Sequence, residues 1–139
     1  MHELHSNLLA SLGAPPAITS DNTAVVCAIV DMQGHKALEW YIATGTLADS
    51  DATFAVAVDH GDQANLSDAA AAPSECLVGT LAAAGFRYDD DSTIKKIGVV
   101  PGRGAGKRYW RLTITPSNNS GAAPLAVLAL RLPLGRPVA

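Results

Sequence analysis

The residues best suited to chemistry are two histidines that lie close to aspartates. His35 and His60 are near Asp31, Asp59 and Asp62, and a metal ion or an acid–base pair would fit if the two segments met. The spacing does not impose that geometry, because both histidines lie at the ends of expected strands, where polar side chains normally face water. We therefore interpret both as structural and predict no metal site.

The glycine-rich segment before Lys107 superficially resembles a phosphate-binding loop. That motif requires a glycine where this chain has Pro101, and a serine or threonine where it has Arg108. A strand follows the segment instead of a helix, so the backbone amides that would hold a phosphate are not expected. Cys27 and Cys76 have neither metal-ligand spacing nor a base partner, and no nucleophile-elbow motif occurs. The sequence therefore predicts reduced thiols, no cofactor and no enzyme.

Length and composition indicate one ordinary globular domain. The chain has 139 residues, of which 48% are hydrophobic but only 5% aromatic, and its net charge is −3. Few aromatic side chains and no basic excess disfavour nucleic-acid binding. No signal sequence or apolar stretch of membrane-spanning length is found, so we expect synthesis in a bacterial cytoplasm and no membrane partner.

The chain is organised around two strands near its end. In Lys107–Thr115, Trp110, Leu112 and Ile114 alternate with polar residues, which is the pattern of a half-buried strand. In the following apolar run, both alternating sets of side chains are apolar, which predicts a central or covered strand. The two sets are Leu125 and Val127, and Leu128, Leu130 and Leu132.

Similar alternation predicts further strands upstream. We expect a hairpin between 23–30 and 37–44, with Leu38, Trp40 and Ile42 facing inward. A strand over 53–59 and another over 94–100 follow, with 101–106 as a hairpin tip. Residues 65–80 are expected to be loop with one turn of helix at most. The sequence thus predicts an all-β protein, an antiparallel β-sandwich that is jelly-roll-like.

The ends of the chain are expected to lie outside this sandwich. Leu4, Leu8, Leu9 and Leu12 recur at roughly helical spacing before Gly13 and two prolines, which predicts an N-terminal arm over residues 1–20. The arm either packs on its own domain or lies on a neighbouring subunit, and we favour the neighbour. The sandwich domain is then 21–134, and 135–139 form an extended C-terminal tail.

Charge divides the chain into two parts of opposite sign. Residues up to Asp91 carry a net charge of −11, whereas those after Ser92 carry +8. Either acidic and basic strands alternate within one fold, or the acidic part of one copy meets the basic part of the next. We favour the second and expect a trimer or similar cyclic homo-oligomer.

Five segments taken together resemble small virion proteins of tailed bacteriophages, over roughly residues 23–132. The segments are Ala37–Phe54, Val58–Asp62, Leu77–Thr80, Ile94–Gly98 and Lys107–Pro116. The resemblance implies a minor capsid, cement or decoration protein on the outer surface of a virion capsid, with the major capsid protein as partner. It transfers no active-site residue. The alternative is a tail or head-tail connector component; a carbohydrate-binding sandwich ranks third, because aromatic residues are few.

Partner-binding residues are expected on the arm, on one outward tyrosine and on the two late strands. They are Leu4, Leu8, Leu9, Leu12, Tyr41, Lys107, Arg108, Arg111, Leu125 and Val127. On this view, removal of residues 1–16 weakens capsid attachment but leaves a folded sandwich. Arg111→Glu weakens self-association mainly at low salt, and Leu125→Asp weakens it at any salt.

Overall fold

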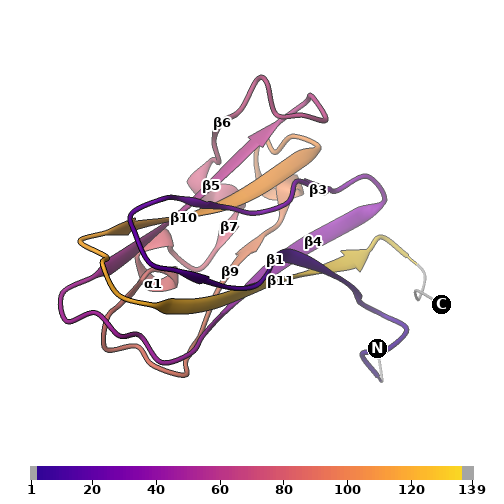
Figure 1. Cartoon of the computed structure of the whole chain (residues 1–139). Helices are drawn as coiled ribbons and strands as arrows, with labels where there is room; N and C mark the ends of the chain where they lie inside the picture. The colour runs from indigo at the N-terminus through magenta and orange to yellow at the C-terminus, as the bar shows by residue number, and fades with distance from the viewer. Residues whose placement is uncertain (1–2, 136–139) are drawn as a thin grey trace.

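The computed structural model describes residues 3–135 and is built almost entirely of antiparallel strands in two layers (Figure 1). The elements are β1 (Leu9–Thr19), β2 (Val25–Val26), β3 (Val30–Asp31), β4 (His35–Thr44), β5 (Thr53–Gly61), β6 (Ala70–Ala71), η1 (Ser74–Cys76), β7 (Leu77–Val78), α1 (Leu81–Ala84), β8 (Phe86–Arg87), β9 (Ile94–Val99), η2 (Pro101–Arg103), β10 (Tyr109–Ser117) and β11 (Ala123–Pro133). No helix among these residues is long and apolar enough to cross a membrane.

The strands form two sheets that pack face to face. The five-stranded sheet has the order β1-β11-β4-β9-β7. In the six-stranded sheet β2, β10, β5 and β6 are neighbours, while β3 pairs with β10 and β8 with β5. Every strand pair is antiparallel. The prediction of an all-β antiparallel sandwich is confirmed; the jelly-roll-like arrangement stays a prediction.

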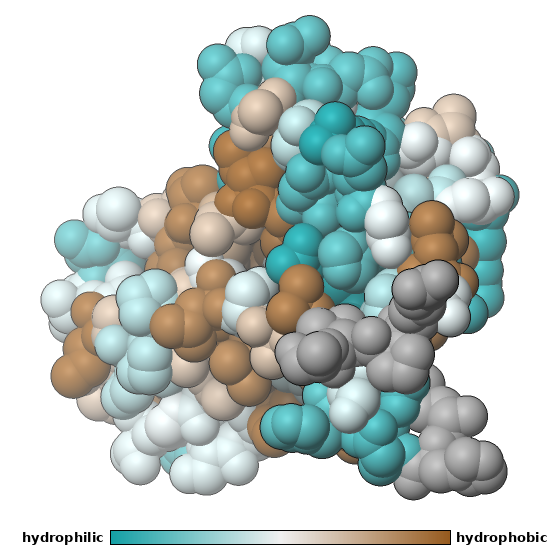
Figure 2. Space-filling model, turned by 90° about the vertical axis from the view of Figure 1, so that its right-hand side faces the viewer, coloured by the Kyte–Doolittle hydropathy of each residue, from teal (hydrophilic) through white to brown (hydrophobic). Residues whose placement is uncertain are grey.

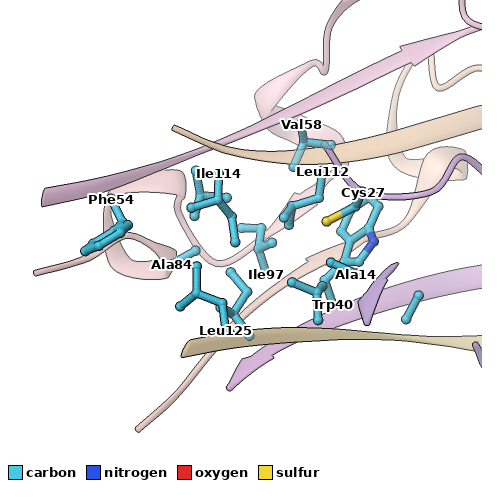
Figure 3. Packing of buried hydrophobic residues seen from close by; sticks show 14 of the residues in the cluster. Ala14, Cys27, Trp40, Phe54, Val58, Ala84, Ile97, Leu112, Ile114 and Leu125 are labelled. Atoms are coloured by element: carbon cyan, nitrogen blue, oxygen red, sulfur yellow. The ribbon is translucent and has the colours of Figure 1, made fainter. Parts of the chain in front are cut away.

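Alternation within the long strands explains how the core forms. In β4 and β10 every second side chain is buried, and Trp40 and Trp110 from opposite sheets are both fully inaccessible to solvent. Leu112 and Ile114 join Val58 and Phe54 on one side of the core, opposite Trp40, Ile97 and Leu125 (Figure 3). A side-chain period of two therefore gives each sheet one apolar inner face.

From β4 onward, consecutive long strands alternate between the sheets, which corrects the expected hairpins. β3 pairs with β10, whereas β4 pairs with β11 and β9, so the turn before His35 is a corner between sheets. Gly34 occupies this turn with a φ of 81°, a backbone conformation that side chains disfavour. Likewise 101–106 connects β9 to β10 across the sandwich. Alternation locates a strand and its faces, but it does not say which strand lies beside it.

The expected N-terminal arm is instead largely an edge strand of the sandwich. β1 pairs with β11 from Leu9↔Arg131 to Thr19↔Ala123, with register shifts on either side of Ala14. Ala14 is buried, and the Val127 side chain lies so close to Gly13 that a Cβ there would be 2.9 Å from Val127 Cγ1. The leucine spacing looked helical because Leu4 and Leu8 precede the strand, and only Leu9 and Leu12 belong to it. The expected tail lies mostly outside the described residues.

Candidate binding surfaces

The two sheets differ sharply in what they show to solvent. On the six-stranded sheet the outward residues of β5 and β10 are small or polar, as in Thr53, Ala55, Ala57, Thr113 and Thr115. On the five-stranded sheet most outward residues are apolar. We call this second surface the apolar face; its larger members are Leu12, Tyr41, Val78, Ile94, Leu128, Leu130 and Leu132.

The apolar face runs across all five strands. Leu12 pairs directly with Leu128, and Leu128 with Tyr41, so the three form one row across β1, β11 and β4. Leu12 is 52% exposed and Leu128 45% exposed. A cleft of about 210 Å³ lies on the same face, lined by Leu8, Glu39, Tyr41, Val78 and Leu130 among others. A largely apolar surface of this kind marks an interaction surface more often than scattered apolar residues do.

Leu125 and Val127, predicted as partner-binding residues, point the other way. Val127 is fully buried and Leu125 is 6% exposed, and both belong to the core. Val127 pairs with Ile42, whose side chain also faces inward. The error has a simple cause: both faces of β11 are apolar, so its own pattern does not distinguish the inner face from the outer one.

A second apolar surface lies at the open edge of the sandwich, between β1 and β2. A cleft of about 460 Å³ occurs there, lined by residues 13–15, 17–21, 23, 25, 26 and 125. Ile18 and Val26 beside it are 65% and 59% exposed. Figure 2 shows hydrophobic residues gathered over the left and centre of its view, the side on which β1 lies, with hydrophilic residues along the top. We call the cleft between β1 and β2, whose lining includes Ile18 and Val26, the edge cleft.

The three basic residues that were predicted to bind a partner form ion pairs within the chain. Lys107 Nζ lies 3.0 Å from Asp62, and Arg111 Nη2 lies 3.4 Å from Asp59. Arg108 donates two hydrogen bonds to Asp31, which holds the pKa of that carboxyl at about 2. These contacts support the interpretation in which acidic and basic strands alternate within one fold. The cyclic oligomer thereby loses the charge argument that motivated it, and the trimer stays a prediction.

The two histidines make separate local contacts. The His60 ring packs against Trp110 with 4.8 Å between ring centroids, and its Nδ1 accepts the Lys107 backbone N–H at 3.1 Å. Burial lowers the pKa of His60, and the nearby Lys107 adds to this effect, so the neutral ring is favoured. His35 Nδ1 lies 3.1 Å from the Gln33 carbonyl oxygen, at a turn. Within residues 3–135, no group of three or more histidine, cysteine, aspartate or glutamate side chains is placed to hold a metal ion.

Both cysteines are free thiols, as predicted, and both are buried. Cys27 packs in the core, and burial raises its pKa to about 11. Cys76 is also buried, with Sγ 3.7 Å from the Pro101 carbonyl oxygen, and burial again raises the pKa. A thiol with a raised pKa is a poor nucleophile at neutral pH.

The remaining predicted partner-binding residues lie near the apolar face or beyond it. Tyr41 is half-buried and outward, in the middle of that face. Leu12 is outward on β1, whereas Leu9 begins the strand and is half-buried. Leu8 lines the cleft of the apolar face, and its backbone N–H bonds to the Leu4 carbonyl. Leu4 is 65% exposed, so the short turn that contains it leaves this side chain in solvent.

Sequence analysis missed several residues of the apolar face. Leu128, Leu130, Ile94 and Val78 are outward, and so are the charged Glu39 and Lys96. A usable signal existed: Trp40 was predicted inward, and antiparallel pairing of β4 with β11 would place Ala129 and Val127 inward with it. The missing information was the register, which no local pattern supplies.

Comparison with known proteins identifies the fold but no family. No model of a protein family and no curated protein matches the chain. Among solved structures, PBSX exported protein XepA matches with a TM-score of 0.55 and 14% identity, over 91% of this chain and 37% of XepA. A Bacillus endospore appendage protein matches with a TM-score of 0.46 and 11% identity, over 93% of this chain and 90% of that one.

Virus components also occur among these distant structural matches. A chain of Broad Bean Stain Virus matches with a TM-score of 0.45 and 12% identity, over 100% of this chain and 91% of that one. At 14% identity the similarity to XepA concerns the fold alone. This chain spans little more than a third of XepA.

Proposed function

We propose that this chain is a structural protein of a tailed-bacteriophage virion, and specifically a cement or decoration protein on the outside of the head. The five segments that resemble small virion proteins of tailed bacteriophages support this proposal. Those within β4, β5, β9 and β10 contribute strands of the two sheets, so the resemblance extends through the sandwich. The partner in this proposal is the major capsid protein.

The observation that carries the proposal is that a small sandwich leaves large apolar surfaces uncovered. The edge cleft leaves Ile18 and Val26 exposed to solvent, at 65% and 59%. A protein that binds at junctions between capsid subunits needs such surfaces, because burial of apolar area supplies most of the affinity. In this proposal the edge cleft contacts the capsid.

A cryo-electron microscopy map of whole virions tests the location. We expect density for the sandwich on the outer surface of the shell, repeated at junctions between major capsid subunits. Density along the tail or at a single vertex would instead support the alternative, a tail or head-tail connector component.

A binding assay tests the surface. Purified chain is mixed with heads that lack it, and bound and free chain are separated by sedimentation. We expect Ile18→Asp and Val26→Asp to weaken binding, because each would place a charge in the apolar contact. Thr115→Asp, on the exposed face of β10, is the matched control and should bind like the unmodified chain. Equal binding by all variants would exclude the edge cleft as the contact.

A further inference from the structure

We propose that the apolar face is a two-fold homodimer interface in which Glu39 of one copy contacts Lys96 of the second copy. This inference does not rest on the proposed function, and it uses a different surface from the edge cleft. It also differs from the head-to-tail ring suggested by the charge division, because the basic residues of that ring are paired inside the chain.

The exposed apolar side chains of the long strands are concentrated on the five-stranded sheet. Leu12 and Leu128 are cross-strand partners and both remain about half exposed, at 52% and 45%. Ile94 and Val78, at the other side of the same face, are 65% and 41% exposed. The outward residues of β5 and β10 in the six-stranded sheet are small or polar instead, so the asymmetry is not a general property of this alanine-rich chain. The apolar face therefore has the composition of a surface that becomes buried.

The charges on this face indicate what covers it. Among the outward strand residues that the structure describes there, only Glu39 and Lys96 are charged. Tyr41 pairs with Lys96, while Glu39 pairs with Gly98, so the acid and the base are diagonal neighbours on adjacent strands. The face thus carries one charge of each sign at its centre and apolar residues around them.

Glu39 lacks full compensation within its own chain. Burial raises the pKa of its carboxyl, and Lys96 offsets that rise only in part. A second cation at this point would favour the ionised carboxylate. A further copy of the same face supplies such a cation.

A two-fold arrangement satisfies both charges at once. In an isologous dimer the same patch meets itself, so every contact occurs twice. Consider a two-fold axis that lies in the interface plane and passes midway between Glu39 and Lys96, perpendicular to the line that joins them. Rotation about this axis places the Glu39 carboxylate of each copy over the Lys96 ammonium group of the other copy. Tyr41, which adjoins both charged residues, then lies near the axis. Charge complementarity of this kind favours a second copy over an unrelated apolar partner.

Sedimentation of the purified full-length chain over a range of concentrations tests the proposal. We expect a concentration-dependent dimer. Lys96→Glu gives the face two acids and Glu39→Lys gives it two bases, so each variant alone should show a dissociation constant raised by about tenfold or more. A mixture of the two variants should dimerise again, because each acidic position then faces a basic one. The double variant with both changes should also dimerise like the unmodified chain.

Two further variants distinguish this interface from non-specific association. Leu128→Asp should give a folded monomer, and Thr115→Asp on the opposite sheet should leave the dimer unchanged; circular dichroism checks folding in each case. A monomer at every concentration in the unmodified chain would overturn the inference. So would a dimer that Leu128→Asp leaves intact, or two charge variants whose mixture associates no better than either alone. Binding to phage heads is measured separately, so failure here leaves the proposed function standing.

Discussion

Arg108 holds Asp31 through two hydrogen bonds, with Nε 2.8 Å from Oδ1 and Nη2 2.9 Å from Oδ2. The two residues are 77 positions apart in the chain, and their contact ties β3 to the beginning of β10. Asp31 also accepts the Gln33 backbone N–H at 3.0 Å, which secures the corner between the sheets. A paired guanidinium and carboxylate of this geometry is a charge-assisted contact with directional specificity.

The first prediction concerns the protonation of Asp31. The Arg108 contact is the largest cause of a pKa of about 2, so Arg108→Ala should raise that pKa toward the ordinary value near 3.8. The native pKa is depressed; the pair therefore stabilises the fold above about pH 4, and this stabilisation is lost as the pH falls toward 2. Titration of carboxyl resonances by NMR measures the change. Lys107→Ala is the control, because Lys107 pairs with Asp62; an Asp31 pKa unchanged in Arg108→Ala would contradict the assignment.

The second prediction separates the two faces of β11. Val127 is fully buried, so Val127→Asp should lower the free energy of unfolding by about 3 kcal/mol or more, because it buries an unpaired charge. Leu128 is 45% exposed, so Leu128→Asp should change the monomer's stability by about 0.5 kcal/mol or less. Urea unfolding at a concentration where the chain is monomeric measures both. Similar losses in the two variants would mean that the faces are assigned incorrectly.

The third prediction concerns the N-terminal strand. Removal of residues 1–16 should unfold or strongly destabilise the sandwich, because it takes away most of β1, including buried Ala14, and leaves β11 as an uncovered edge. Removal of residues 1–7 stops before the strand and should leave the fold intact. Thermal unfolding followed by circular dichroism compares the two. A stable sandwich without residues 1–16 would restore the original view of this segment as a separable arm.

The fourth prediction concerns the thiol of Cys27. Burial raises its pKa to about 11, so in the folded chain it should be nearly inert to a disulfide reagent at pH 8 and should react rapidly after unfolding in urea. A Cys76→Ala variant isolates this signal, because the structure describes no other cysteine. Rapid reaction of the folded variant would show that the core around Cys27 opens readily.

Sequence patterns predicted the long strands well because the cause of the pattern is local. Trp110, Leu112 and Ile114 were assigned inward from alternation alone, and all three are fully buried. Trp40 was assigned inward in the same way, and correctly. The side-chain period of a strand follows from its backbone geometry, so it is visible within a few residues.

The features that sequence analysis missed depend on partners far away in the chain. Leu125 was assigned to a partner interface because β11 is apolar on both faces, and only its register with β4 distinguishes the inner face from the outer one. Gly13 and the prolines after it suggested the end of an arm, whereas the strand continues through them beside β11. Arg111 was assigned to an interface because the sequence shows its charge but not its partner. That partner, Asp59, is 52 positions away in the chain.

The pairing of β1 with β11 also has a consequence for the order in which the protein is made. The ribosome releases Leu9 long before Arg131, yet the two are direct neighbours in the finished sheet. β4 likewise lacks its β11 neighbour until that strand has left the exit tunnel. Until β11 has emerged, a nascent chain leaves one backbone edge of β4 unpaired, and it should depend on chaperones during that interval.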